Sequence, residues 1–179
     1  MLFENDDLIV RKLVKEDCYI LSKWLSDPRV LQYYEGRDQP FNLSRMESEF
    51  ISSGDEKTQD LVLYQGVKIG YIQFYKLDKE MKDQYGYTDQ IIYGMDLFIG
   101  EVMYWNKGIG SLLVTSMAGY LLENQCADRV VMDPQVRNER ALTCYEKCGF
   151  RKVERLPGHE LHEGKLEDCW LMEIQKESI

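Results

Sequence analysis

The hydrophobic residues of this chain fall into short runs typical of strands and into longer stretches where apolar positions recur with a helical period. Strand-like patterns are expected at residues 8–14, 60–65, 68–77, 90–99, 129–132, 150–155 and 167–175. Helical patterns are expected at residues 16–26 and 29–34, around Met46 and Phe50, and in the segments that follow Gly108 and Asn138. Strands and helices therefore interleave, as in a mixed α/β chain.

Several residues mark the expected ends of these elements. Pro28 ends the first helix, and Gly149 is a natural C-terminal stop for the last one. Ser44, with Glu47 three residues later, has the spacing of a capping box. Gly66 predicts a hairpin between the two strands that flank it.

Two polar stretches are expected outside these elements. Residues 54–57 form a polar loop, and residues 79–89 form an exposed connection or the end of a long hairpin. No internal repeat, low-complexity tract or linker divides the chain, so residues 1–179 are expected to form a single domain.

The strand at residues 90–99 is apolar on both faces, which is typical of a sheet covered on both sides. Period-two alternation places Asp96 on the face of Gly94 and Phe98. A carboxylate there costs several kcal/mol unless it is paired, protonated or open to a cleft. Asp96 is therefore either a structural acid satisfied by backbone donors or a functional acid at a cavity.

A glycine-containing turn follows this strand and opens an amphipathic helix. Gly108 and Gly110 lie where the first backbone N–H groups of the helix have no partner within it. Unpaired N–H groups, the positive end of the helix dipole and the small size of glycine together favour an anion, so the turn predicts a phosphate site.

Three phosphate-binding motifs compete for this turn. A P-loop requires Lys followed by Ser or Thr after the glycines, and no such pair is present. A dinucleotide fingerprint requires a third glycine where the chain has Leu113, although Asp128 lies at the distance of a ribose-binding acid. The third interpretation is a pyrophosphate site for coenzyme A.

Further candidate residues lie downstream. Asp133 follows a short strand that Pro134 ends, and strand ends are where open α/β sheets bind ligands. Tyr145 is either a core aromatic or a functional hydroxyl. Cys144 and Cys148 lie one helical turn apart, but two thiols leave a zinc site short of ligands, so small packing residues are expected.

The two histidines, His159 and His162, lie in a predicted loop beside Pro157 and Gly158. Their spacing is not that of the H-E-x-x-H motif, and no third clear ligand is apparent. Polar contacts, including contacts to a substrate, are expected in place of a metal site.

Composition and charge narrow the partners. The chain has 179 residues, 44% of them hydrophobic, enough for one compact core. It carries 22 Lys and Arg against 31 Asp and Glu, a net charge of -9. An acidic field repels nucleic acid and attracts small polycations, although solubility alone also explains the charge. We expect a monomer or a homodimer.

Targeting and redox signals point to the cytoplasm. No apolar run approaches the ~20 residues of a membrane span, and the N-terminus lacks a basic region before an apolar one. The five cysteines include no C-x-x-C pair and suit a reducing compartment. No membrane partner is expected.

Two longer stretches carry a family resemblance: Y-W-N-K-G-I-G at residues 104–110 and N-E-R-A-L-T-C-Y-E-K-C-G-F at residues 138–150. They resemble the GNAT acetyltransferases. Within that superfamily the chain is similar to aminoglycoside 6'-N-acetyltransferases, including the acetyltransferase half of bifunctional aminoglycoside-modifying enzymes. The likeness extends from residues 24–27 and 36–38 to residues 159–165.

The resemblance implies a GNAT fold, with a central mixed, mostly antiparallel sheet splayed in the middle and helices on both faces. It implies acetyl-CoA as acetyl donor and no metal. The residues implied for the coenzyme are Leu97, Phe98, Ile99, Lys107, Gly108, Ile109, Gly110, Ser111, Asn138 and Tyr145. The residues implied for the acceptor are Tyr34, Glu35, Asp38, Asp96, Asp133, His159 and Glu160.

The resemblance also implies an activity, transfer of acetyl to the 6'-amine of aminoglycosides with resulting antibiotic resistance, in which Asp96 and Tyr145 are catalytic. Asp96 acts as base or anchors the ammonium, because direct transfer from an alkylamine to an ordinary carboxylate costs roughly 9 kcal/mol. Tyr145 is a candidate general acid for the leaving thiolate. The alternatives are another amine acceptor, such as a polyamine, a siderophore precursor or a peptide, and a non-catalytic acyl-CoA-binding module.

One position departs from the family pattern. Trp105 stands where GNAT enzymes usually carry Gln or Arg before the glycines. A polar phosphate contact is missing there, and Lys107 is the expected source of the charge.

Overall fold

The computed structural model describes residues 1–50 and 57–176. Most of the polar loop expected at residues 54–57 lies outside this range. The described elements form one eight-stranded sheet in the order β1-β2-β3-β4-β5-β6-β8-β7. The strands are β1 (Phe3–Asn5), β2 (Leu8–Lys12), β3 (Thr58–Tyr64), β4 (Val67–Lys76), β5 (Ile92–Ile99), β6 (Arg129–Met132), β7 (Arg151–His162) and β8 (Lys165–Gln175). Neighbouring strands pair antiparallel except β5 and β6, which confirms a mixed, mostly antiparallel sheet.

The sheet opens between β5 and β6. These strands pair only where Ile92–Gly94 lies beside Arg129–Val131, whereas β4 accompanies β5 as far as Ile99. From Met95 onward β5 therefore has a sheet neighbour on one side only. This confirms the splayed sheet that the family resemblance implies.

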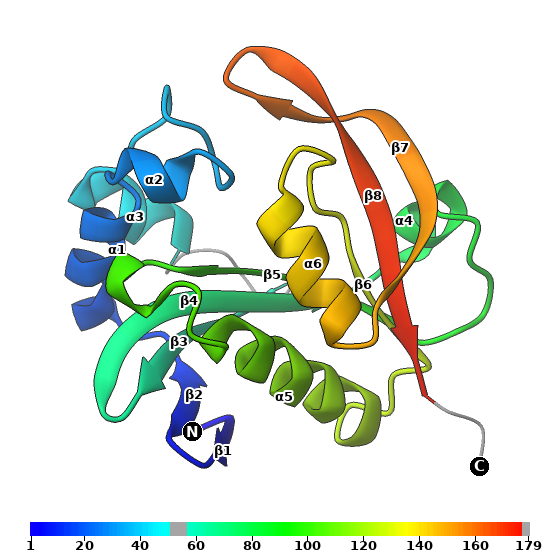
Figure 1. Cartoon of the computed structure of the whole chain (residues 1–179), viewed down its shortest axis with the longest axis horizontal. Helices are drawn as coiled ribbons and strands as arrows, with labels where there is room; N and C mark the ends of the chain where they lie inside the picture. The colour runs from blue at the N-terminus through cyan, green and yellow to red at the C-terminus, as the bar shows by residue number, and fades with distance from the viewer. Residues whose placement is uncertain (51–56, 177–179) are drawn as a thin grey trace.

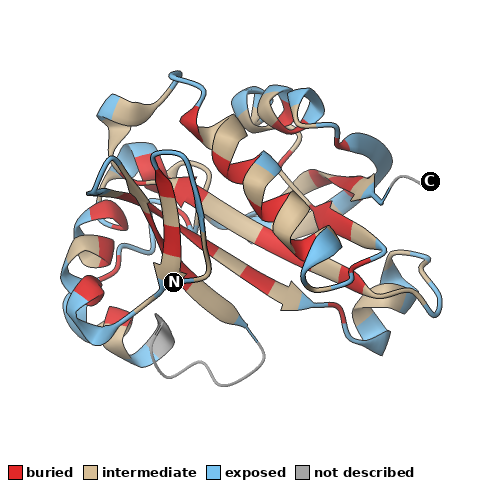
Figure 2. Cartoon of the chain, turned by 90° about the horizontal axis from the view of Figure 1, so that it is seen from below, coloured by how far each residue is buried: buried red, intermediate tan, exposed pale blue. Residues whose placement is uncertain are grey.

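Helices cover both faces of the sheet (Figure 1). The helices are η1 (Lys15–Asp17), α1 (Cys18–Trp24), α2 (Pro28–Leu31), α3 (Leu43–Phe50), α4 (Lys79–Gln84), η2 (Val102–Tyr104), α5 (Ile109–Glu123) and α6 (Glu139–Lys147). One core joins α5 and α6 to the sheet, and a second joins α1, α2 and α3 to the opposite face. Buried residues follow the strands and the inward sides of the helices (Figure 2).

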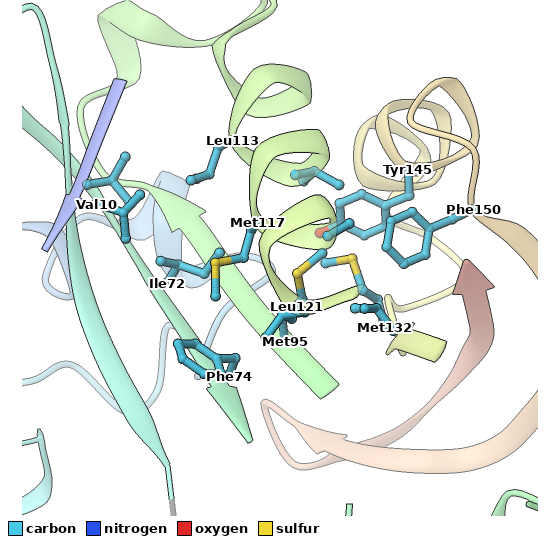
Figure 3. Close-up of a cluster of buried hydrophobic side chains, with 14 of the residues drawn as sticks. Val10, Ile72, Phe74, Met95, Leu113, Met117, Leu121, Met132, Tyr145 and Phe150 are labelled. Atoms are coloured by element: carbon cyan, nitrogen blue, oxygen red, sulfur yellow. The ribbon is translucent and has the colours of Figure 1, made fainter. Parts of the chain in front are cut away.

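Alternation along β5 assigns its side chains to these two cores. Met95 and Leu97 pack into the core under α5, where Met95 lies near Met117 and Leu121 (Figure 3). Phe98 packs into the core under α1 and α2. Because side chains alternate along a strand, Asp96 points to the same face as Phe98, as the sequence predicts.

Two expectations need correction. The cap of α3 is Asn42, whose Oδ1 accepts the Arg45 N–H at 2.9 Å, so Ser44 lies inside the helix. Residues 79–89 are the expected exposed connection, and they contain the short helix α4, which Asp78 caps by accepting the Met81 N–H at 2.8 Å. The short polar strand β1 has no apolar alternation from which to predict it.

The second correction concerns the histidines. They lie in β7, which runs on to His162, and not in a loop. Pro157 and Gly158 suggested a break, but the strand absorbs them in an irregularity between Leu156 and Glu160 and remains paired with β8.

No helix within residues 1–50 and 57–176 is both long and apolar enough to cross a bilayer.

Candidate active site

A cavity of about 1020 Å³ lies where β5 and β6 separate. Its walls come from the segment after α2, from β4 and β5, from the turn before α5, from the residues after β6, from α6 and from β7. The lining of the cavity therefore comes from parts of the chain that lie more than a hundred residues apart in the sequence.

Most of the predicted site residues line this cavity. They are Tyr34, Glu35, Asp96, Leu97, Phe98, Ile99, Gly108, Gly110, Ser111, Asp133, Asn138, Tyr145, His159 and Glu160. Three predicted residues are not in its wall. Asp38 is exposed in the loop after α2, and the Lys107 ammonium lies 5.7 Å from the centre of the Tyr104 ring, on the exposed side of the turn. The Ile109 side chain is 4% exposed and belongs to the core, which leaves its backbone as the only group it can offer.

Asp96 is held by a neighbouring strand. The antiparallel register places Gln73 of β4 opposite Asp96, and Gln73 Nε2 donates to Asp96 Oδ2 at 2.7 Å. Burial, together with the nearby charge of Asp133, raises the Asp96 pKa to about 6, and the hydrogen bond from Gln73 opposes the shift. Asp96 is therefore a cavity acid with a side-chain partner, not an acid sealed in by backbone donors.

Aromatic rings form the wall beside Asp96. The centres of the Tyr34 and Phe98 rings lie 4.7 Å apart, and the Phe98 and Tyr71 rings are stacked with their centres 5.5 Å apart. Tyr75 lies opposite Gly94, where a Cβ atom would come within 2.7 Å of the Tyr75 ring. Glycine at this position lets the tyrosine lie across the strand.

A second acid lies at the end of β6. Asp133 Oδ2 lies 2.8 Å from His159 Nε2, and the Tyr85 hydroxyl lies 3.2 Å from the same nitrogen. The hydrogen bond with Asp133 raises the His159 pKa, and burial opposes it. Sequence reasoning named Asp133 and His159 separately, and they come together because β8 pairs with β6 on one side and with β7 on the other.

The helix α6 contributes Asn138 and Tyr145. Asn138 caps the helix by accepting the Ala141 N–H at 3.2 Å, as the sequence predicts. Tyr145 is 9% exposed and packs against Phe150, so it is both a core aromatic and part of the cavity wall. Burial raises the Tyr145 pKa, which keeps the phenol protonated.

The turn before α5 has the open geometry that its glycines predict. Gly108 adopts φ 78° and caps the helix without a side-chain hydrogen bond. Trp105, the position that departs from the family pattern, donates its indole N–H to the Ile99 carbonyl at 2.7 Å. The Arg140 guanidinium lies 3.9 Å from the centre of the Trp105 ring.

Positive charge reaches the cavity from α6. Arg140 and Lys147 line it, and among the described residues Arg140 has no carboxylate within salt-bridge distance. Glu139 also lines the cavity, in the first turn of the helix. Sequence reasoning missed Arg140, although its position seven residues before Lys147 places both on one helical face.

Cys144 of α6 and Cys148, which follows this helix, pack it against α5. Cys144 Sγ lies 3.4 Å from Ser111 Oγ, and Cys148 Sγ lies 3.5 Å from the Ser111 carbonyl oxygen. This confirms their predicted packing role. Across residues 1–50 and 57–176, no three His, Cys, Asp or Glu side chains gather in a way that could hold a metal ion.

Comparisons with known proteins give a consistent result. A family model described as an acetyltransferase (GNAT) domain matches residues 14–157. Aminoglycoside N(6')-acetyltransferase type 1 of Klebsiella pneumoniae is 25% identical over 155 residues, which cover 83% of this chain and 76% of that protein.

Two solved structures share the fold. AAC(6')-Ib in complex with ribostamycin and coenzyme A has a TM-score of 0.74 at 20% identity, covering 96% of this chain and 94% of that one. Spermidine N-acetyltransferase from Vibrio cholerae, in complex with CoA and spermine, has a TM-score of 0.76 at 17% identity, covering 96% of each chain. At these levels of sequence identity, the two structures show only that the fold is shared.

Proposed function

We propose that this chain, which belongs to the GNAT acetyltransferase family, transfers the acetyl group of acetyl-CoA to the 6'-amine of aminoglycosides. The observation that carries the proposal is the division of charge within one cavity. The first turn of α5 and Arg140 bring positive potential to one part of the wall, whereas Asp96, Asp133 and Glu160 bring negative charge to another. A polyanionic donor and a polycationic acceptor each find a complementary surface.

The donor half of the cavity suits acetyl-CoA, which supplies the thioester. The edge of β5 that β6 leaves unpaired carries backbone groups of the segment Leu97–Ile99, which can bond the amides of the pantetheine arm, apart from the Ile99 carbonyl that already accepts from Trp105. The backbone N–H groups of Gly108–Ser111 suit the diphosphate. Arg140, which lies over the Trp105 ring, supplies the phosphate charge that Lys107 was expected to give.

The acceptor half suits an amine with several positive charges. Asp96 anchors the reacting ammonium group. Its pKa of about 6 lowers the cost of taking a proton from an alkylamine only to roughly 6 kcal/mol. Asp96 therefore orients the amine, and the proton leaves through the open cavity to water. The protonated Tyr145 hydroxyl donates to the sulfur as negative charge develops there.

The likeness to an aminoglycoside N(6')-acetyltransferase favours this class of acceptor. A thiol-release assay with acetyl-CoA tests it against kanamycin, tobramycin, spermidine and a set of peptides. We expect release with the two aminoglycosides, mass spectrometry of the product placing the acetyl group at the 6'-nitrogen, and raised kanamycin tolerance in a susceptible bacterium that expresses the chain.

A polyamine acetyltransferase is the second candidate, because the acidic wall also suits spermidine and a spermidine N-acetyltransferase shares the fold. Release with spermidine but not with aminoglycosides would replace the first proposal by the second. Binding of coenzyme A by calorimetry without release from any acceptor would instead indicate a non-catalytic acyl-CoA-binding module.

A further inference from the structure

His159 and Asp133 form a hydrogen-bonded pair that a bound molecule can reach. Their side chains are 17% and 32% exposed, and both residues line the cavity. His159 Nε2 lies 2.8 Å from Asp133 Oδ2, and the Tyr85 hydroxyl lies 3.5 Å from that oxygen. The second carboxylate oxygen, Asp133 Oδ1, has no hydrogen-bond partner among the described residues. Asp133 therefore has one oxygen engaged by His159 and one free for a ligand.

The groups facing this pair from the cavity are acidic. Glu160 follows His159 in β7, and Asp96 of β5 acts electrostatically on both Asp133 and Tyr85. Within the described part of the chain, His159 is the only side chain that can bring a positive charge to Asp133 at salt-bridge distance.

The remaining neighbours do not change this balance. The Cys169 thiol of β8 lies 3.8 Å from Glu160 Oε2, and burial raises its pKa, which keeps it neutral. Asp168 accepts the Gly158 N–H at 2.8 Å and pairs with Arg155 at 2.8 Å, so its charge is compensated outside the cavity.

We propose that His159 is an exchangeable counterion: as imidazolium it holds Asp133 in the free protein, and it loses its proton when a second ammonium group of the acceptor binds Asp133. This inference rests on the proposed function, because it requires a polycationic acceptor. One positive charge arrives, and one proton passes from the imidazolium to solvent. The net charge beside Asp133 is therefore the same before and after the second ammonium group binds.

The exchange makes the acceptor site selective. An acceptor with a single amine occupies Asp96 and leaves the His159–Asp133 pair as it is. An acceptor with a second, suitably placed amine gains Asp133 as well, and it gains more as rising pH empties His159 of its proton. Selection for polycations thus depends on pH, whereas binding of a single amine does not depend on His159.

Proton NMR of the two histidines tests the exchange directly. His162→Gln leaves one histidine and assigns its resonance to His159. We expect kanamycin to lower the His159 pKa by at least one unit, which is a tenfold loss of proton affinity, and 6-amino-6-deoxyglucose, with its single amine, to leave it unchanged. Calorimetry in buffers of different ionisation enthalpy should show proton release with kanamycin only.

His159→Gln separates exchange from mere support of Asp133, because glutamine keeps an N–H donor but cannot titrate. In the unsubstituted protein the kanamycin KM should fall about tenfold relative to that of 6-amino-6-deoxyglucose between about pH 6 and about pH 8. In His159→Gln this ratio should be flat while the acetyl-CoA KM is unchanged. Titration of Asp96 affects both acceptors and cancels in the ratio.

The outcomes distinguish the two proposals. Kanamycin that binds without moving the His159 pKa overturns the exchange and leaves the proposed function standing. If thiol release identifies spermidine as the acceptor, aminoglycoside transfer fails and the exchange is judged by the same titration with spermidine. Failure of both polycations to bind overturns both proposals.

Discussion

At the scale of single residues, Asp96 is the residue of the central sheet that we propose binds the reacting amine of the acceptor. Its carboxylate lies on the open strand, in the wall of the cavity, and accepts a hydrogen bond from the Gln73 side chain. A group in this position anchors a cation only while it carries a charge. The role assigned to it is thus tested by removing the charge and keeping the shape.

Asp96→Asn is expected to lower kcat/KM for the aminoglycoside at least a hundredfold, because the amide cannot anchor an ammonium group. The Kd of coenzyme A, measured by calorimetry, should change less than twofold. Asp89→Asn, at an exposed position away from the cavity, is the matched control. Near-normal turnover of Asp96→Asn would remove Asp96 from the mechanism.

Asp60 is a second buried carboxyl, and it affects stability. It is 1% exposed, its Oδ2 has no hydrogen-bond partner in the described part of the chain, and burial raises its pKa from 3.8 to about 6 while Lys12 opposes the shift. Between about pH 4 and about pH 6 the folded chain keeps a proton that the unfolded chain has lost. Stability therefore falls as pH rises through this window.

Asp60→Asn removes this ionisation. We expect the variant to be more stable than the parent above pH 6, by on the order of 1–3 kcal/mol, and equal to it below pH 4. Urea unfolding across this pH range measures the difference, with Asp89→Asn as control. A constant difference at every pH would show that packing, and not ionisation, distinguishes the two proteins.

At the scale of elements, the end of β5 is tied to the turn before α5 by one side chain. The Trp105 indole N–H satisfies the Ile99 carbonyl, and the ring supports Arg140. Trp105, which stands where the family usually has a polar phosphate contact, therefore has two other roles. It fixes the edge of the open strand and carries a cation from the next helix.

Trp105→Phe keeps a ring for Arg140 but leaves the Ile99 carbonyl without its donor. The expected cost is about 1 kcal/mol, or a Tm lower by roughly 2–4 °C in calorimetry. The acetyl-CoA KM should rise severalfold, because the edge of β5 is no longer fixed. Trp170→Phe, in β8, is the matched control for ring size. An unchanged Tm would show that this hydrogen bond contributes little.

Arg140 and Lys107 offer rival sources of positive charge for the donor. Arg140→Gln is expected to raise the acetyl-CoA KM about tenfold, because a guanidinium already held in place is lost. Lys107→Gln should change it less than twofold, because that ammonium lies outside the cavity wall. Calorimetry with coenzyme A gives the binding constants. The reverse order of effects would restore the expectation drawn from the sequence.

Local patterns predicted the elements well wherever the signal is contained in one segment. The strand at Arg129–Met132, the Asn138 cap and the open turn at Gly108 all follow from neighbouring residues. The partners of the site do not. Gln73 reaches Asp96 only through the β4–β5 register, and no local pattern encodes that register.

The same limit hid the acceptor wall. His159 and Asp133 lie 26 positions apart and meet because β7 continues past a proline and a glycine that read as a break. Tyr85 joins them from the segment after α4, a helix of charged residues without an apolar stripe. The sequence shows which of these side chains can ionise or donate hydrogen bonds. Which of them lie next to one another depends on how the strands pair in the tertiary structure.

At the scale of the whole molecule, the net charge of -9 acts on the two substrates in opposite senses. It attracts a polycationic acceptor over distances beyond the cavity and repels a polyanionic donor, which binds through local positive groups. Long-range attraction is screened by salt, since the Debye length shrinks from about 20 Å to about 7 Å between roughly 20 mM and 200 mM salt.

We therefore expect kcat/KM for kanamycin to fall severalfold over this salt range, while the value for acetyl-CoA stays constant or rises. Steady-state kinetics at fixed pH, with 6-amino-6-deoxyglucose as the acceptor of lower charge, measures both. Equal salt dependence for kanamycin and the single-amine acceptor would show that overall charge does not steer binding.

The short β5–β6 contact has a mechanical consequence. Among the described strands, only three residue pairs join the block of strands β1–β5 to the block formed by β6, β8 and β7. We therefore expect the two blocks to move relative to each other more easily than neighbouring strands in a fully paired sheet. A long ligand bound in the gap between β5 and β6 would contact both blocks of strands and hold them together. Binding of such a ligand should therefore slow amide hydrogen exchange in the strands on both sides of the gap, including residues that the ligand does not contact.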